Sequence, residues 1–347
     1  MGVKQWVKPA FGAALDRSGL AWLFEAFPWP ANGFVALTYH RLKPDPDLDD
    51  ALLNVADLEA FDAQMAFLAR RMRPISGDDL IAHLTEGRAL PPRAVLVTFD
   101  DAYRDFLTDG WPIMKRHGVP ATLFVPTAYP GGEIAGFWWD RLARALRRTP
   151  AGALDLPVGG AVRWDDAATR AHALERLREV IETSHVAEAM ALVDTWMRQL
   201  GAPPAGGPPA GETAMCTWAE LRALAAEGVT LGAHTRSHAI LARLPLEAAR
   251  AEIVGSRDDL AQQTGVAPRL FCYPNGKPGT FNDDTGRLLR GAGFVGAFVT
   301  LRGFNRADGR DPMQLRRMSV SRRTSMGAFR MHLAPAVLQA RERLGQL

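Results

Sequence analysis

The stretch AVLVTFDD, Ala94 to Asp101, joins an apolar run to two adjacent carboxylates. Residues 94–99 lack the regular polar positions of a half-exposed strand, so they are predicted to form a strand that is buried on both faces. Such strands are typical of parallel α/β sheets, in which functional side chains gather at the carboxyl ends of the strands. Asp100 and Asp101 stand at that end of the predicted strand.

Five other short apolar runs indicate further strands of the same sheet. They are FVALTY (34–39), ATLFV (121–125), VTLGA (229–233), LFCY (270–273) and VGAFVT (295–300). Amphipathic stretches with helical periodicity lie between them, at 58–71, 103–117, 218–227, 246–264 and 283–291. This alternation predicts a parallel α/β architecture, either open or closed into a barrel.

Three segments do not follow this alternation of strands and helices. Residues 138–200 have helical periodicity without a convincing strand and run into the linker-like stretch GAPPAGGPPAG (201–211). We therefore expect about 130–214 to form a mostly helical insertion in a domain that spans 34–324. Residues 1–33 and 325–347 are predicted to form helical segments at the two ends of the chain.

The composition is that of a globular protein. Of the 347 residues 47% are apolar and 23% are charged, and the net charge of +3 gives no indication of nucleic-acid binding. Two cysteines exclude a disulfide framework and favour a cytoplasmic location. No apolar run approaches the roughly 18 residues that cross a bilayer. Charges interrupt residues 1–33, which excludes a signal peptide; this amphipathic segment is expected to pack on its own domain, with peripheral contact to the inner membrane surface as the alternative.

Asp100 and Asp101 have two interpretations. Adjacent residues on an extended chain point in different directions, so one carboxylate can bind a metal ion while the other stays free as a base. Alternatively, an aspartate at this position caps the helix that follows. Taken alone, the pair favours capping.

The sequence HTRSH (234–238) changes that balance. His234 and His238 are four residues apart and follow a predicted strand, so both imidazoles can face one ion. Histidine pairs at this spacing are common by chance. Here, however, both motifs lie at strand ends, where they can converge. Two histidines and one carboxylate leave coordination positions open, as in a catalytic metal site.

Two more strand ends carry polar groups. Tyr273-Pro274-Asn275-Gly276 is first of all a turn, but such a turn can present a backbone N–H to a developing oxyanion. His40 follows the predicted strand 34–39 and is a candidate acid or ligand, although a histidine in this position is more often an ordinary packed or capping residue.

TFDD (98–101), HTRSH (234–238) and YPNG (273–276), in this order, resemble the motifs of the polysaccharide deacetylase family, the NodB-homology or carbohydrate esterase 4 group. The resemblance covers about 34–320 and implies a distorted, incomplete (β/α) barrel. It implies that Asp100 is the general base and that a divalent metal ion, expected to be Zn²⁺, is held by Asp101, His234 and His238. It also implies that the Tyr273 amide, with Pro274 and Asn275, holds the oxyanion.

Two features depart from the family pattern. The family usually has an arginine beside the base at the position of Cys272, and Arg269 lies three residues earlier. The usual Leu-x-His-Asp motif, which supplies the general acid, is absent from the sequence. Some members instead carry a Tyr-His at the end of an N-terminal strand, so the resemblance nominates His40 as the acid. His332 is a weaker candidate.

The resemblance implies hydrolysis of the N-acyl amide, chiefly N-acetyl, of an amino sugar in a polysaccharide, chitooligosaccharide or lipid-linked glycan precursor. One alternative is a deformylase of a lipid-linked amino sugar. Another is a glycan-binding protein with a non-functional site, which the missing arginine favours. A non-haem iron oxygenase also uses two histidines and a carboxylate, but such sites lie in all-β barrels. The sequence does not define the oligomeric state.

Overall fold

The computed structural model describes residues 29–42, 55–134, 136–184, 186–202, 214–306 and 311–343. The predicted N-terminal helical segment lies almost entirely outside these residues, as does most of the linker-like stretch 201–211. Across the described ranges, no helix combines the length and the apolar character needed to span a membrane.

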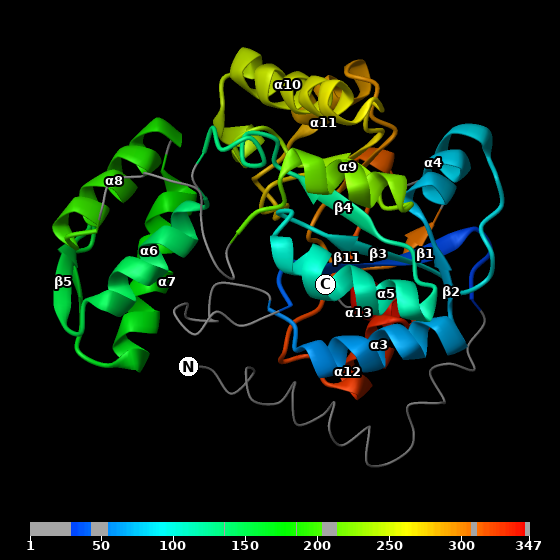
Figure 1. The fold of residues 1–347 in the computed structure, drawn as a ribbon, viewed down its shortest axis with the longest axis horizontal. Coiled ribbons are helices and arrows are strands. Elements are labelled where there is room, and N and C mark those ends of the chain that lie inside the picture. Colours follow the sequence, from blue (N-terminus) through cyan, green and yellow to red (C-terminus); the bar gives the residue numbers. More distant parts are fainter. Residues whose placement is uncertain are drawn as a thin grey trace.

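A nine-stranded sheet forms the centre of the described part of the chain (Figure 1). Its main order is β10-β1-β3-β4-β7-β8-β9, with β11 beside β1 and β2 beside β3. The strands are β1 (Gly33–Tyr39), β2 (Arg73–Ile75), β3 (Ala94–Phe99), β4 (Thr122–Val125), β7 (Thr230–Ala233), β8 (Leu270–Cys272), β9 (Gly296–Phe298), β10 (Asn305–Arg306) and β11 (Arg317–Ser319). The pairs within β1-β3-β4-β7-β8-β9 are all parallel, so their carboxyl ends share one edge.

The sheet curls until its last strand meets its first. The N–H of Val299 donates to the carbonyl of Leu315 at 2.9 Å, and the N–H of Leu315 donates to Ala297 at 2.8 Å. Leu315 leads into β11, which pairs with β1 in parallel. These bonds join the two edges over a short length only, and the predicted distorted, incomplete barrel is confirmed.

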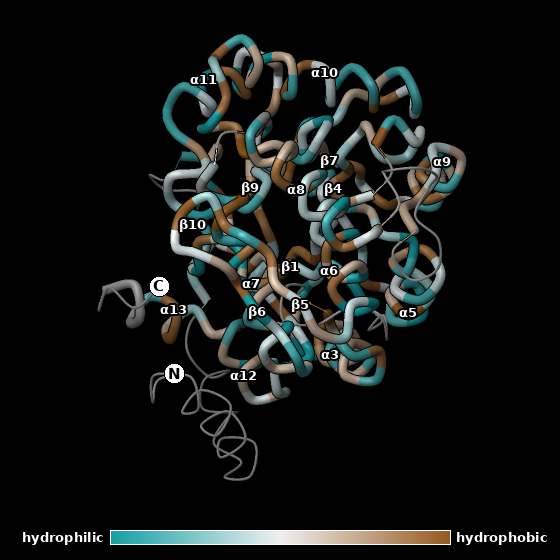
Figure 2. The backbone as a smooth tube through the Cα atoms, turned by 90° about the vertical axis from the view of Figure 1, so that its left-hand side faces the viewer, coloured by the Kyte–Doolittle hydropathy of each residue, from teal (hydrophilic) through white to brown (hydrophobic). Residues whose placement is uncertain are grey.

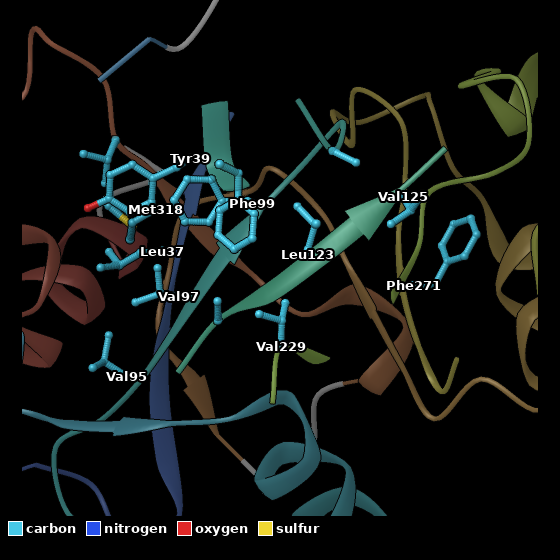
Figure 3. Close-up of a cluster of buried hydrophobic side chains, with 14 of the residues drawn as sticks. Leu37, Tyr39, Val95, Val97, Phe99, Leu123, Val125, Val229, Phe271 and Met318 are labelled. Carbon is cyan, nitrogen blue, oxygen red and sulfur yellow. The ribbon is translucent and has the colours of Figure 1, made fainter. Parts of the chain in front are cut away.

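Helices cover the outside of the barrel. They are α3 (Leu58–Arg71), α5 (Trp111–His117), α9 (Trp218–Ala226), α10 (Leu246–Thr264), α11 (Asp283–Gly291), α12 (Met326–His332) and α13 (Pro335–Arg343). Their apolar faces pack on outward-facing strand residues such as Leu37, Val97 and Phe99 (Figure 3). Helix α4 (Gly77–Glu86) instead packs Leu80 into the cluster inside the barrel.

Alternation along the strands directs every second side chain inward. Phe34 and Ala36 belong to the inner cluster, whereas Val35 and Leu37 belong to the outer one. This period places Thr38 and Thr98 inward, and it continues to His40 and Asp100 at the strand ends. The inward row of β11 carries Arg317, which has no exposed surface.

The insertion forms a unit with its own apolar core. It contains α6 (Trp138–Arg148), β5 (Gly152–Asp155), β6 (Ala161–Trp164), α7 (Ala167–Thr183) and α8 (Val186–Gln199). Figure 1 shows this unit beside the barrel, and Figure 2, viewed from that side, shows it in front of the strands.

The predicted strands and helices are found close to their expected bounds, and three helices match residue for residue. The insertion is mostly helical, as expected, but two details differ from the sequence interpretation. The insertion contains a hairpin, β5–β6, because Gly159 and Gly160 adopt positive φ angles that allow the chain to reverse between two short strands. The C-terminal segment forms two helices, because Pro335 begins a new helix after Leu333 ends the first.

Gly232 on β7 allows a close approach inside the barrel. A Cβ at this position would lie 2.4 Å from the ring of Phe124 and 3.0 Å from the carbonyl oxygen of Leu270. We expect Gly232→Ala to lower the free energy of unfolding by about 1–3 kcal/mol, because ring and backbone must both shift. Gly291→Ala is the matched control, since its Cβ would meet nothing within 4 Å. Urea denaturation of both variants measures the difference, and equal stabilities would contradict the tight contact.

Candidate active site

The candidate residues lie at the carboxyl ends of the strands, as the sequence predicts. His40 follows β1, Asp100 and Asp101 follow β3, His234 and His238 follow β7, and Tyr273 follows β8. They line one cavity of about 370 Å³. Parallel strands therefore bring together groups from four distant parts of the chain.

Asp101, His234 and His238 form a compact set of three potential ligands. Oδ1 of Asp101 lies 3.6 Å from Nε2 of His234 and 3.4 Å from Nε2 of His238. One ligand atom from each residue lies within 4.8 Å of the others. A single cation could therefore contact all three residues, which also line the cavity.

The protonation of the histidines suits metal binding. Nδ1 of His234 is 2.7 Å from the carbonyl oxygen of Cys272. Because that oxygen can only accept a hydrogen bond, Nδ1 carries the proton and Nε2 presents its lone pair to Asp101. Burial lowers the pKa of His234 to about 4 and also lowers the pKa of His238. Both imidazoles are therefore neutral near pH 7, as ligands must be.

Asp101 provides a test of whether a cation fits. Its side chain is almost fully buried, and Oδ1 accepts no hydrogen bond from any residue that the structure describes. Burial and the charge of Asp100 both raise the pKa of Asp101. A buried carboxylate oxygen facing two imidazole lone pairs is the environment that a divalent cation satisfies. The three residues fit a metal ion.

Asp100 is held by an arginine that the sequence interpretation missed. Nη1 and Nη2 of Arg317 donate to Oδ1 and Oδ2 of Asp100 at 2.7 and 2.8 Å. The guanidinium lies over the rings of Phe124 and Phe298, 5.9 and 5.8 Å from their centroids. Burial alone raises the pKa of Asp100, but the charge and hydrogen bonds of Arg317 outweigh burial and hold the pKa below its usual range. Asp100 is therefore an ionised carboxylate.

Arg317 occupies the place where the resemblance predicted an arginine from β8. Cys272 stands there, and its Sγ lies 3.0 Å from Nη2 of Arg317. Arg269 precedes β8, is exposed and lies at the opposite end of the strand. The sequence feature that could have identified Arg317 is two adjacent arginines, Arg316 and Arg317, between Leu315 and Met318. A charged side chain on the inner face of a buried strand requires a partner.

His40 lies beside Asp100 and also lines the cavity. Its Nε2 is 3.8 Å from Oδ2 of Asp100, and its side chain is 21% exposed. Burial lowers the pKa of His40, and the charge of Asp100 opposes that effect. His332 lies on α12, which packs against α3, and it is not among the residues found to line the cavity.

In the turn after β8, the backbone N–H of Tyr273 makes a hydrogen bond that the sequence interpretation did not include. The N–H of Tyr273 donates to the carbonyl of Phe298 at 3.0 Å, so this amide is part of the sheet and is occupied. Pro274 accepts from Gly276 at 2.8 Å, which closes the turn. Asn275 faces the cavity with a φ of 65°, and its Oδ1 is buried without a hydrogen-bond partner in the described residues. Asn275 is thus better placed than Tyr273 to contact a ligand.

The loop that carries His238 is held from outside by Glu252 of α10. This carboxylate accepts from the N–H groups of Arg236 and Ser237 at 2.8 and 2.9 Å, and from Oγ of Ser237 at 2.7 Å. Thr235 and His238 both have a φ of 61°, a strained conformation for residues other than glycine. Glu252 therefore stabilises a loop geometry that the chain alone disfavours.

We expect Glu252→Ala to weaken divalent metal binding by about 10–100-fold, because the loop is free to move His238 away from Asp101. Titration with Zn²⁺ against a competing chelator measures this affinity. Glu247→Ala on the same helix, whose side chain is 80% exposed, is the control and should bind as the wild type does. Equal affinities for the two variants would show that Glu252 does not support the site.

Comparison with known proteins agrees with this geometry. The sequence profile of the polysaccharide deacetylase family matches residues 87–149 and 161–297, more than half of the chain. A poly-β-1,6-N-acetyl-D-glucosamine N-deacetylase of Escherichia coli K12 is 37% identical over 99 residues, which are 27% of this chain and 14% of that protein. An enzyme of the same name from Staphylococcus epidermidis is 28% identical over 112 residues, 29% of this chain and 38% of that protein.

Solved structures share the fold at low sequence identity. A deacetylase of Streptococcus pyogenes, PplD with bound acetate, has a TM-score of 0.59 at 17% identity, covering 88% of this chain and 100% of that one. IcaB from Ammonifex degensii has a TM-score of 0.54 at 18% identity, covering 88% and 97%. The resemblance inferred from the three motifs is confirmed: the chain belongs to the polysaccharide deacetylase family.

Proposed function

We propose that this protein is a metal-dependent hydrolase that removes the N-acetyl group from an amino sugar in a glycan. The observation that carries the proposal is the meeting of Asp101, His234 and His238 beside an ionised Asp100. The named relatives act on poly-N-acetylglucosamine, which supports an N-acetylhexosamine as the reacting sugar. A glycan-binding protein without activity is less well supported, because Arg317 supplies the positive charge that Cys272 does not.

Three residues of the site would bind a divalent metal ion. Asp101, His234 and His238 would hold it, and we propose zinc because two imidazoles and a carboxylate are a donor set that zinc favours. When bound there, a divalent ion supplies Lewis acidity to the carbonyl and to the attacking water.

Both cysteines are buried free thiols, which supports a reducing, cytoplasmic setting.

The remaining residues move protons and stabilise charge. Asp100, ionised and free of the metal set, takes the proton of the attacking water. The side-chain amide of Asn275, on the cavity wall, donates to the oxyanion through its NH₂ group. It takes the place of the backbone N–H of Tyr273, which is occupied. His40 donates a proton to the leaving nitrogen, since an amine leaves poorly as an anion. The products are acetate and a free amino sugar.

We expect Asp100→Asn to lower acetate release by about 10²–10⁴-fold, because an amide cannot accept the proton of water. Metal content, measured by mass spectrometry of the purified protein, should not change. The substitution leaves Arg317 without its charge partner, so circular dichroism must show that the assayed protein is folded. Asp165→Asn, on an exposed turn of the insertion, is the control. An active Asp100→Asn enzyme would show that another group is the base.

The role of His40 as acid can be separated from its role in binding. We expect His40→Gln to lower amide hydrolysis by about 10²–10⁴-fold. Hydrolysis of 4-nitrophenyl acetate should fall far less, because nitrophenolate leaves without a proton. Steady-state rates on both substrates test this. Similar losses on the amide and the ester would contradict proton donation by His40.

A further inference from the structure

The insertion supplies part of the cavity wall. Trp138 and Trp139 of α6 and Ile181 and Glu182 of α7 line the same cavity as the metal-site residues. Most of the rest of the wall comes from loops that follow the strands of the barrel. The shape of the substrate that can reach Asp101 therefore depends on how firmly the insertion is attached and over which strands it lies.

The base of the insertion is anchored to the barrel by buried contacts. Nε1 of Trp139 donates to the hydroxyl of Tyr103 at 3.0 Å, and that hydroxyl donates to Oδ2 of Asp140 at 2.8 Å. Phe137 stacks on Trp139, with 4.2 Å between ring centroids, and also packs on Tyr129 at 4.4 Å. Swinging this end away would break buried hydrogen bonds and expose an aromatic cluster, so it is a fixed wall.

Helix α7 of the insertion contacts a different part of the barrel. Oε2 of Glu182, at the end of α7, lies 3.8 Å from Nζ of Lys277 in the loop after β8. Tyr103 and Tyr129, at the anchored base, follow β3 and β4. In the sheet, β7 lies between β4 and β8. The insertion therefore spans the barrel mouth over β7, whose loop carries both metal-ligand histidines.

The barrel contributes a second group of residues to the cavity lining: His40 after β1, Thr300 and Arg302 after β9, and Ser319 on β11. An internal unit of a polymer needs an exit on both sides of the reacting sugar, whereas a terminal unit needs only one. The volume of about 370 Å³ is near the lower limit of ligand pockets, which hold about 300–1,000 Å³.

We propose, building on the function proposed above, that this enzyme deacetylates the terminal amino sugar of a glycan chain or short glycoconjugate, and not internal units of a polymer. The insertion closes the cavity on the β3-to-β8 side, and the chain leaves past β9, β11 and β1. The reacting unit is terminal because the anchored insertion blocks one of the two exits that an internal unit needs.

The test is to map the deacetylated unit. Pentasaccharides of N-acetylglucosamine, β-1,4- and β-1,6-linked and isotopically labelled at the reducing end, are treated with the zinc-loaded enzyme. Fragmentation mass spectrometry then locates each free amine. We expect the first acetyl group to leave from one terminal unit. Deacetylation of internal units at similar rates would overturn the proposal.

A variant tests the closing contact directly. Glu182→Ala with Lys277→Ala removes the contact between α7 and the loop after β8, and we expect the share of internal free amines to rise well above that of the wild type. Glu188→Ala, on an exposed position of α8, is the control and should keep the terminal pattern. An unchanged pattern in the double variant would overturn the assignment of this contact. Absence of acetate from every substrate would contradict the proposed function itself.

Discussion

The ion pair between Asp100 and Arg317 is the interaction on which the rest of the site depends. Both side chains are buried inside the barrel and meet through two hydrogen bonds. Removing one partner of such a pair leaves a buried charge and costs about 3–5 kcal/mol. The pair joins β3 to β11, strands that lie 217 residues apart at the paired positions. It therefore fixes the charge of the proposed base and also links the two strands that flank β1.

Cys272 leaves room for the ion pair between Asp100 and Arg317. An arginine at position 272 would project from β8 into the inner row where Arg317 now lies, because Cys272 faces the barrel interior. The small thiol leaves that space open and lies in contact with the guanidinium. The same cationic function has thus been supplied from another strand, and the unusual residue in the third motif is explained by packing. It is no sign of a lost function.

The sequence allowed the strand ends to be predicted because their pattern is local. Apolar runs followed by Asp100, His234 or His40 are visible without knowledge of distant contacts, and parallel strands must bring their ends together. Arg317 could not be assigned in this way, because its strand is three residues long and its partner lies far away in the sequence. The occupied amide of Tyr273 also depends on a distant feature, the register between β8 and β9.

The two adjacent aspartates lie in opposite environments, which suits the two roles proposed for them. Arg317 lowers the pKa of Asp100, whereas burial and Asp100 itself raise the pKa of Asp101. The positive φ of 74° at Asp101 turns its carboxylate away from the arginine and toward the histidines. Opposite environments on neighbouring residues are the arrangement that separates a base from a ligand. A cation at Asp101 would stabilise its ionised form without using Asp100, whose charge is already balanced by Arg317 and remains available to accept a proton.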